Sequence, residues 1–421
     1  MNNDEKAELL ARADTLSSKA IQVFKPRTPI TTKELFAGRW GELKAVADAV
    51  HQAGLHVVIY GERGVGKTSL ANVVHPTIWA LERFGMTDEE AGAIPERLVI
   101  KAVANSSDTF SSIWNKVFDE ITWPDNEGKS TTATFLLPVN LSIDHVRKVL
   151  AQTPGAVFII DEFDQAPRGI SKQFTELIKA LQDLVIDSTV IVVGVSETVD
   201  NLIANHASIN RALIQIPLKR MKPEDLRIIL QNAETPLGIK FSQDATNLIV
   251  HISQGLPHYT HLIGLHAVRS AANRLSLQLV EREDVFEALK KAVKEAEQTV
   301  TDAHLKATRS SHKTALYRHV LLGCALAAAR SQEPLGYFNP SAIVEPLNDI
   351  LQKDVTIASF TNHLAEFCQD KRGNVLERDG QPWGYRYRFR NPLLVPFVFM
   401  DGLESGITNG QGLVDMLSRE N

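Results

Sequence analysis

The chain has 421 residues, more than one hydrophobic core usually supports, so we expect two or three domains. Its 44% hydrophobic and 23% charged residues are typical of a globular protein, and its net charge of −5 excludes a uniformly basic nucleic-acid coat. Cys324 and Cys368 are its two cysteines, too few for a disulfide framework or a cysteine-rich zinc site.

The first predicted element is an amphipathic helix over residues 4–24. The segment 25–29 contains two prolines and breaks this helix, so residues 1–30 are assigned to an N-terminal helix and linker. A second helix is expected over residues 40–52, ending near Gly54, because glycine commonly ends helices.

A phosphate-binding motif follows an apolar run at residues 56–60. It is the stretch Gly61-Glu62-Arg63-Gly64-Val65-Gly66-Lys67-Thr68, and a helical pattern continues from Ser69. In a strand–loop–helix of this kind, glycines let backbone N–H groups surround phosphates, and the helix N-terminus adds positive potential. We therefore expect residues 61–69 to bind ATP, with Lys67 at the β- and γ-phosphates and the Thr68 hydroxyl on Mg²⁺.

Further apolar strands are predicted at residues 98–103, 156–160 and 190–195. Helices are expected between them, over residues 109–121, 142–152 and 171–186, and residues 123–140 are interpreted as an insertion. Apolar strands that alternate with helices predict a parallel sheet covered on both faces. Residues 31–220 are thus assigned to an α/β nucleotide-binding domain.

Acidic residues end the most apolar of these strands. Asp161 and Glu162 directly follow residues 157–160, at the carboxyl edge where open α/β sheets bind ligands. We expect Asp161 to complete the Mg²⁺ shell and Glu162 to orient or deprotonate the attacking water. Asp164 is interpreted as polar surface rather than a metal ligand.

Helices dominate beyond residue 217. Those expected over 223–233, 242–253, 257–273 and 282–297 form an α-helical lid domain, residues 221–298. The charged, polar residues 294–313 are interpreted as a linker or a long exposed helix, and 299–313 are assigned to a linker. Helices near 314–330, 341–351 and 357–369, followed by a hairpin turning at Asp379-Gly380, predict a winged-helix domain over residues 314–403. Residues 404–421 are assigned to a loosely held tail.

The second hairpin strand alternates in character. Tyr385, Tyr387 and Phe389 would share one face, and the basic residues of the strand would share the other: Arg386, Arg388 and Arg390. Such an arginine stripe suits contact with DNA phosphates or with a protein partner. Residues 304–403 hold 12 Lys and Arg against 9 Asp and Glu, a net charge of +3 that leaves −8 for the remainder.

These motifs together resemble those of the AAA+ P-loop ATPases, nearest to the origin-recognition, initiator-like branch with a C-terminal winged helix. Residues 36–43 resemble the adenine-side box of that family, residues 61–68 match Walker A, and residues 160–162 match Walker B. The resemblance implies that Ser196 is the sensor-1 residue and that Arg211 is an arginine finger for a neighbouring subunit, with Arg220 as the alternative. It also implies a sensor 2 at the start of the helix following Gly255.

The chain departs from the family at two places. The sensor-2 position holds His258 instead of arginine, or the sensor is absent, so a contact with phosphate would depend on imidazole protonation. The helix expected to enter DNA, within residues 357–367, carries no lysine or arginine until Lys371 and Arg372. Sequence-specific reading of duplex DNA is therefore in doubt.

The sequence thus predicts a cytoplasmic ATPase that uses ATP and Mg²⁺, forms homo-oligomers in the ATP state, and does not enter membranes. Its nucleotide state would govern assembly and engagement of DNA or of a protein that acts on DNA. Two rivals remain open. One is an autoinhibited signalling or defence switch whose winged helix contacts protein, and the other is an adaptor that binds nucleotide with negligible turnover.

Overall fold

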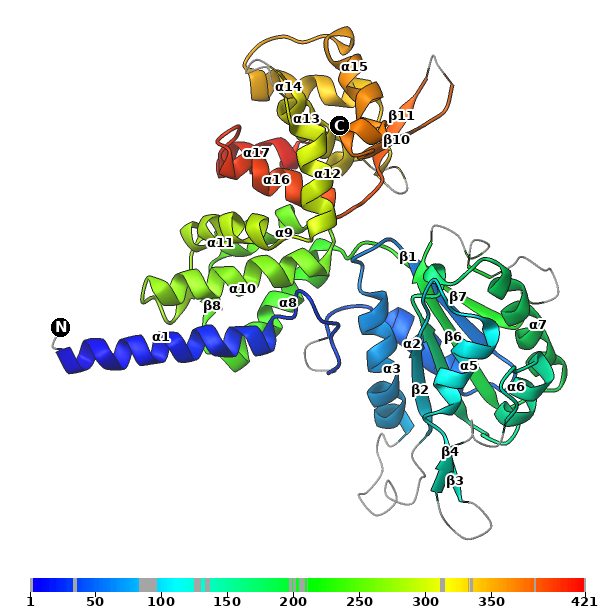
Figure 1. The fold of residues 1–421 in the computed structure, drawn as a ribbon. Coiled ribbons are helices and arrows are strands. Elements are labelled where there is room, and N and C mark those ends of the chain that lie inside the picture. The colour runs from blue at the N-terminus through cyan, green and yellow to red at the C-terminus, as the bar shows by residue number, and fades with distance from the viewer. Residues whose placement is uncertain are drawn as a thin grey trace. The chain divides into compact units, whose positions relative to one another are not determined.

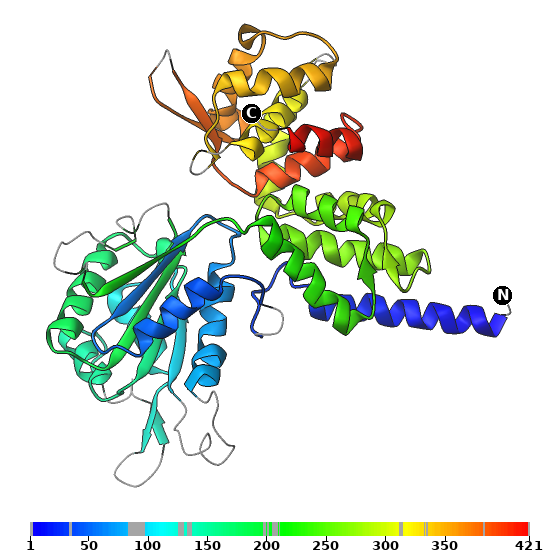
Figure 2. The same cartoon turned by 180° about the vertical axis from the view of Figure 1, so that it is seen from behind.

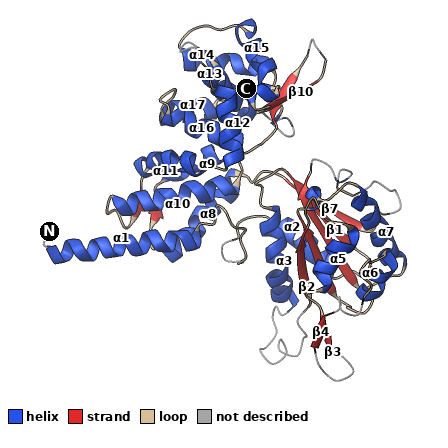
Figure 3. Ribbon diagram, in the orientation of Figure 1, coloured by secondary structure: helices blue, strands red, loops and turns tan. Residues whose placement is uncertain are grey.

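A computed structural model describes residues 3–32, 36–82, 97–124, 130–132, 137–196, 199, 202–203, 209, 211–310, 315–331, 333, 336–381 and 384–419. The chain divides into two compact units. We call residues 29–219 the α/β unit, and residues 1–28 together with 220–421 the helical unit. Figure 1 shows the path of the chain through both, and Figure 3 shows that the long strands gather in the α/β unit. No described helix is long and apolar enough to cross a bilayer.

Five parallel strands form the central sheet of the α/β unit, in the order β2-β5-β6-β1-β7. The strands are β1 (His56–Gly61), β2 (Val99–Val103), β5 (Ala156–Asp161), β6 (Ser188–Val195) and β7 (Leu213–Leu218). The helices are α2 (Trp40–Val50), α3 (Lys67–Glu82), α5 (Phe110–Phe118), α6 (Ile143–Leu150) and α7 (Gly169–Asp183). The predicted parallel sheet is confirmed, and its strands begin and end within two residues of the expected positions.

Helices cover both faces of this sheet (Figures 1 and 2), as runs of apolar residues along parallel strands require. Helices α5, α6 and α7 pack on one face, where Val58, Phe158 and Val192 are fully buried with Trp114 and Phe174. Helices α2 and α3 lie on the other face. Because side chains alternate along a strand, the residues between those core positions point toward α2 and α3.

A short hairpin, β3 (Thr122–Pro124) with β4 (Ser130–Thr132), occupies part of the predicted insertion at 123–140. Residues 125–129 and 133–136 of that insertion lie outside the described residues. The hairpin follows α5 directly and belongs to the α/β unit.

The helical unit begins with α1 (Asn3–Val23) and resumes at residue 220. Its lid-like part contains α8 (Pro223–Leu237), β8 (Lys240–Phe241), α9 (Gln243–Ser253), α10 (Pro257–Asn273), β9 (Leu279–Val280) and α11 (Arg282–Glu295). Helix α1 packs against α8 and α10, so the N-terminal helix joins this unit. Leu16, Ala20 and Phe24 form its buried stripe, and a Cβ added to Gly264 of α10 would lie 2.7 Å from the Phe24 ring.

After α12, the described residues of the C-terminal part contain the helices α13, α14 and α15 followed by a hairpin, in the order that the sequence predicts. Its elements are α12 (Gln298–Thr308), α13 (Tyr317–Arg330), α14 (Val344–Leu351), α15 (Ile357–Phe367), β10 (Leu376–Asp379), β11 (Arg386–Phe389), α16 (Leu394–Glu404) and α17 (Gly410–Ser418). Helix α16 packs on α9, α11 and α13, and the Tyr259 hydroxyl of α10 donates a 2.6 Å hydrogen bond to Leu393 O. The C-terminal part and the lid-like part therefore form one compact unit.

Two segments differ from their predicted roles. The stretch 299–313, assigned to a linker with a long exposed helix as the alternative, lies largely in α12, where Val300, His304 and Ala307 form a buried face. This buried face was not predicted, because one of its positions is histidine and the rest of the segment is polar. Residues 404–421, interpreted as a loose tail, contain α17, which the Asn409 side chain caps by accepting a hydrogen bond from Gly412 N.

Helix α17 is held from two sides. Leu413 and Met416 are buried, and Arg330 donates from Nε to Met416 O at 2.6 Å. At the C-terminal end of the helix, Arg419 forms ion pairs of 2.8 Å with Glu345 and 2.6 Å with Asp349 of α14. Three glycines within 406–412 gave this segment the composition of a loop, which explains the misassignment.

Candidate active site

The loop after β1 has the backbone that phosphate binding requires. Gly64 and Gly66 adopt left-handed φ angles of 84° and 96°, which residues with a Cβ rarely adopt. A Cβ added to Gly61 would lie 2.2 Å from Leu218 O of the neighbouring strand β7, so this position also excludes larger residues. Helix α3 begins at Lys67, which places its N-terminal N–H groups at the loop.

Lys67 is buried within the loop. Its Nζ donates to Glu62 O at 2.8 Å and to Gly61 O at 3.2 Å. Burial lowers the pKa of Lys67 to about 8, against the opposing effect of the carboxylates of Asp164, Asp161 and Glu62. The two carbonyls hold the Lys67 ammonium at the loop, where it can pair with an anion such as phosphate.

The acidic strand end lies beside this loop. The Oδ1 atom of Asp161 accepts hydrogen bonds from the Thr68 hydroxyl at 3.4 Å and from Glu162 N at 2.9 Å, and only 3% of Asp161 is exposed. A hydroxyl and a carboxylate oxygen are donors that Mg²⁺ accepts, and Mg²⁺ usually keeps waters and phosphate oxygens as its other ligands. The Thr68–Asp161 pair therefore fits a magnesium ion brought with a nucleotide.

The next residues leave the sheet in a strained turn. Glu162 has a left-handed φ of 54° and an exposed side chain. Non-glycine residues rarely adopt this conformation, and such residues cluster at functional sites. Asp164 is half-buried, and its Oδ1 accepts a 2.7 Å hydrogen bond from Val195 N. Asp164, interpreted as polar surface rather than a metal ligand, therefore also holds the end of β6.

Ser196 directly follows β6, beside the phosphate loop. Val195 is the register partner of Gly61 in the parallel pairing of β6 with β1, and Ser196 N donates to Gly61 O at 3.4 Å. The structure thus brings Ser196 to the same sheet edge as Lys67 and Asp161.

Arg211 lies at the other edge of the sheet. It is exposed and precedes β7, whose Leu213 pairs with His56 while Leu218 pairs with Gly61. The span of a six-residue strand, about 20 Å, therefore separates Arg211 from the phosphate loop of its own chain. Residues 206–208 and 210 of the predicted finger segment lie outside the described residues. The alternative finger, Arg220, belongs to the helical unit.

The segment before α2 contacts the phosphate loop. Arg39 is left-handed with a φ of 62°, and its guanidinium donates to Val65 O at 3.3 Å and to Lys219 O. Upstream, Ile30 N donates a 3.1 Å hydrogen bond to the Ser69 hydroxyl. Ser69 therefore anchors the chain where it enters the α/β unit.

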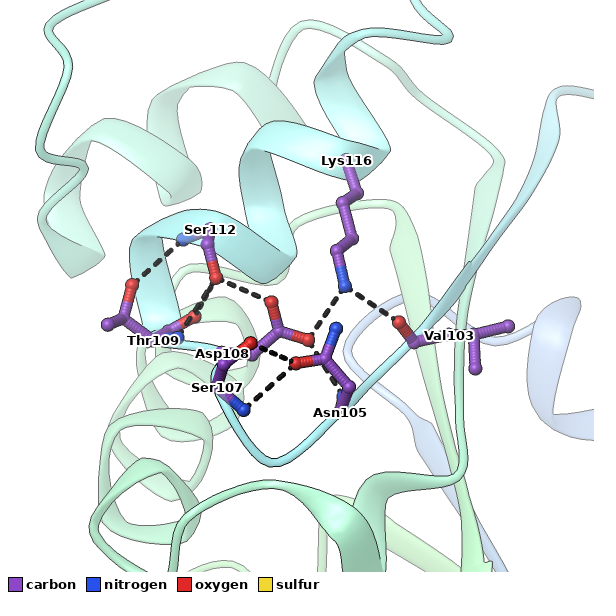
Figure 4. Close-up of polar contacts among 7 residues, drawn as sticks. All are labelled: Val103, Asn105, Ser107, Asp108, Thr109, Ser112 and Lys116. Atoms are coloured by element: carbon purple, nitrogen blue, oxygen red, sulfur yellow. Dashed lines mark hydrogen bonds and ion pairs between the residues drawn. The ribbon is translucent and has the colours of Figure 1, made fainter.

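A polar cluster that the sequence analysis missed fixes the loop after β2 (Figure 4). Buried Asp108 accepts from Lys116 Nζ at 2.7 Å, from the Ser112 hydroxyl at 2.7 Å and from Asn105 N at 2.8 Å. Burial alone would raise the pKa of Asp108, but these hydrogen bonds outweigh it and lower the pKa. The same loop contacts the acidic strand end, because Ala104 N donates to Asp161 O at 2.9 Å. The serine- and asparagine-rich sequence at 105–112 was the available signal.

His258, the expected sensor-2 residue, lies in the helical unit. Its Nδ1 is 2.6 Å from Pro26 O, in the segment after α1.

The hairpin arginines are paired with acids of their own unit. Arg386 forms ion pairs with Asp379 at 2.8 Å and Glu333 at 2.9 Å, and Arg388 pairs with Glu377. Both guanidinium groups also lie over the Tyr337 ring, 4.6 Å and 5.0 Å from its centre. Arg390 is exposed, and its backbone N–H bonds to Val375 O.

The fold and the site define a P-loop NTPase of the AAA+ type: a parallel sheet in the order β2-β5-β6-β1-β7, with a glycine-rich loop after β1 and an acidic end on β5. The model of the family described as Novel STAND NTPase 1 matches residues 24–324. The chain belongs to this NTPase family.

Solved structures show a similar fold. The ORC2 protein of Aeropyrum pernix matches with 15% identity and a TM-score of 0.50, over 94% of this chain and 97% of that one. A Walker-type ATPase of Pyrococcus abyssi matches with 14% identity and a TM-score of 0.49, over 90% and 99% of the two chains. The Aeropyrum pernix ORC1 protein, solved in complex with DNA, matches with 15% identity and a TM-score of 0.46, over 89% and 95%. No curated protein matches the chain significantly.

Proposed function

We propose that the chain is a Mg²⁺-dependent ATPase that acts as a regulatory switch, with a nucleotide state that governs its assembly and its contact with a protein partner. The observation that carries the ATPase role is that Lys67, Thr68 and Asp161 lie at the same edge of the sheet. Lys67 donates a hydrogen bond to Gly61 O of the phosphate loop, and the Thr68 hydroxyl donates one to Asp161. Family membership supports the NTPase chemistry.

Each residue of the edge would have a distinct task. The N–H groups of residues 61–69 would bind the phosphates, and Lys67 would neutralise the β- and γ-phosphate charge. Thr68 and Asp161 would hold Mg²⁺, which supplies further charge neutralisation at the phosphates. Glu162 would orient and deprotonate the attacking water, and Ser196 would hydrogen-bond the γ-phosphate or that water.

Binding of a fluorescent ATP analogue tests this role directly. Lys67→Ala should abolish binding while leaving the circular dichroism spectrum unchanged, because it removes the buried phosphate-facing charge. A folded Lys67→Ala variant that binds ATP as tightly as the wild type would refute the phosphate-loop assignment. Glu162→Gln serves as the matched variant, since it should retain binding.

Assembly through Arg211 is the next part of the proposal. Its position at the sheet edge opposite the phosphate loop supports action on another copy's nucleotide, because its own loop is about 20 Å away along β7. ATP-dependent oligomers in light scattering would support this arrangement. A monomer at all nucleotide states would overturn it.

The pairing of the hairpin arginines favours a protein partner over DNA. Counterion release drives DNA binding when free positive charges meet phosphates. Arg386 and Arg388 are compensated by Glu333, Glu377 and Asp379, which lowers that drive. Helix α15 adds no basic residue, since its sequence IASFTNHLAEF carries no lysine or arginine.

Engagement of DNA is the second candidate, and the exposed Arg390 together with the net charge of +3 over residues 304–403 favours it. A gel-shift titration of the wild type with single- and double-stranded DNA separates the two. Binding that weakens steeply between low and high salt would establish the DNA role, and undetectable binding at low salt would leave the protein-contact role.

A further inference from the structure

A lysine lies among mostly apolar side chains on the sheet face that α3 covers. Lys101 sits in the middle of β2, in register with Ile159 of β5, and its side chain is 27% exposed. Ile159 and Ile59, which point to this same face, are almost fully buried. Placing a charged side chain here costs free energy unless specific partners compensate it.

Two partners do so. Lys101 Nζ lies 2.8 Å from Oδ2 of Asp161 and 2.8 Å from Oδ1 of Asn72 on α3. The carboxylate of Asp161 is thereby divided between two sets of contacts. Its Oδ2 is held by Lys101, and its Oδ1 faces the Thr68 hydroxyl and Glu162 N.

This division has an electrostatic consequence for any cation at Asp161. A divalent ion on the Thr68 side would approach a carboxylate whose charge the Lys101 ammonium already neutralises. The like charges would repel across a few ångströms in a site of reduced dielectric, where such repulsion changes affinity by at least about tenfold. The phosphates of a nucleotide, arriving with the metal, would add enough negative charge to reverse that balance.

We propose that Lys101 is a positioning and selectivity residue: it orients Asp161 and suppresses binding of a free divalent cation, so that the site takes metal as a metal–nucleotide complex. The statement that the site takes metal as a metal–nucleotide complex rests on the proposed nucleotide function. The statement that Lys101 suppresses binding of the free ion concerns Lys101 and Asp161 alone.

Titration of the nucleotide-free full-length protein with Mn²⁺, followed by electron paramagnetic resonance, tests whether Lys101 suppresses binding of the free ion. Lys101→Met should bind Mn²⁺ at least about tenfold more tightly than the wild type, because the competing charge is gone. Lys101→Arg should stay close to the wild type, and the double variant Lys101→Met/Asp161→Asn should lose the gain. Unchanged or weaker Mn²⁺ binding by Lys101→Met would overturn the proposal.

Lys116 offers a matched control. It pairs with the buried carboxylate of Asp108 at 2.7 Å, much as Lys101 pairs with Asp161. Lys116→Met should leave the Mn²⁺ affinity of the Thr68–Asp161 site unchanged, because Lys116 pairs with Asp108 and not with Asp161. An equal gain in Lys116→Met would show a non-specific effect and would also overturn the proposal.

Two further measurements keep the test decisive. If Lys101→Met fails to fold, Lys101→Gln replaces it, since the amide removes the charge while retaining hydrogen-bonding capacity. Mn²⁺–ADP binding is measured on the same samples, and Lys101→Met should change this affinity less than that of Mn²⁺ alone. If no sample binds nucleotide, the proposed function fails, whereas the result for free Mn²⁺ still decides the role of Lys101.

Discussion

The carboxylate of Asp164 accepts a 2.7 Å hydrogen bond from the backbone N–H of Val195, and this bond joins the turn after β5 to the end of β6. Asp161 ends β5 and Ser196 directly follows β6, so the bond to Asp164 helps to set the spacing between these two residues. Gly194 permits this approach, because a Cβ there would lie 3.1 Å from Asp164 Oδ1 and 2.7 Å from Leu202 Cδ2.

Asp164→Ala should therefore reduce ATP turnover more than ATP affinity. It removes the hydrogen bond to Val195 N, which should cost about 0.5–1.5 kcal/mol of stability because the exposed N–H can bond to water instead, and it frees the strand end that places Ser196. Chemical denaturation and steady-state phosphate release measure the two effects. Asp164→Asn, whose amide oxygen can still accept the hydrogen bond from Val195 N, should lose less stability and less ATP turnover than Asp164→Ala. Equal losses in the two variants would contradict a role for this hydrogen bond.

ATP affinity should fall as pH rises above about 8, the pKa of Lys67 in the nucleotide-free protein. Phosphate binding favours the protonated ammonium, so each pH unit above that value should weaken binding by up to about tenfold. Fluorescent ATP titrations from about pH 7 to pH 10 test this. Lys67→Arg, if it binds, should show a flat profile, because arginine stays charged throughout.

The same lowered pKa makes a stability prediction of the opposite sense. Between about pH 8 and pH 10.5 the unfolded chain holds a proton at Lys67 that the folded chain has released, so this residue should make the folded state more stable as pH rises. The difference in unfolding free energy between the wild type and Lys67→Met isolates this contribution. A difference that is constant with pH would contradict the lowered pKa.

Glu162→Gln should keep ATP bound and stop its hydrolysis. The amide preserves the size of the side chain at this left-handed position but cannot accept the proton of the attacking water. Single-turnover hydrolysis and ATP affinity, measured on one preparation, give the result. Turnover at the wild-type rate would move the basic role away from Glu162.

Arg211→Ala should spare ATP affinity and lower turnover, by a factor of roughly 10³–10⁵ if it acts as an arginine finger. Because the residue is far from its own phosphate loop, the wild-type rate per subunit should rise with protein concentration. Mixing Arg211→Ala with Glu162→Gln should restore partial activity, since each supplies what the other lacks. No restoration, together with a concentration-independent rate, would indicate a monomeric enzyme.

Replacing Arg386, Arg388 and Arg390 by alanine should leave ATPase activity without partners unchanged, because these residues lie in a different unit from Lys67 and Glu162. If the hairpin binds DNA, the triple variant should weaken binding to all sequences alike and lower the salt slope by about one per lost contact. If the hairpin instead contacts a protein, neither the triple variant nor the wild type should change the mobility of DNA in a gel-shift titration. A sequence-dependent loss would contradict backbone tracking.

The sequence predicted the nucleotide edge of the α/β unit well because local signals coincide there. The apolar run before Gly61 determines β1, the glycines determine the loop, and Asp161 ends a fully buried strand. The role of Lys101 was not predicted, although a charged residue within an apolar strand was a visible signal. Its partners Asn72 and Asp161 are 29 and 60 positions away, and the parallel register that unites them is a property of the folded sheet.

Long-range packing explains the other misses. Helices α12 and α17 have weak intrinsic signals and form because Val300, Leu413 and Met416 find apolar partners within the helical unit. The ion pairs of the hairpin arginines likewise depend on Glu333, which lies more than fifty positions upstream of Arg386. Alternation alone placed these arginines on one face, but it carried no information on their partners.

The helical unit is built from two separate stretches of the chain, residues 1–28 and 220–421, and this affects the order in which its parts are synthesised. Helix α1 leaves the ribosome before its packing partners α8 and α10, which follow only after the intervening residues 29–219. At about 5–20 residues per second, synthesis of that stretch takes roughly 10–40 s, long enough for the α/β unit to fold on its own. Throughout that interval the apolar stripe of Leu16, Ala20 and Phe24 lacks the partners that bury it in the folded chain.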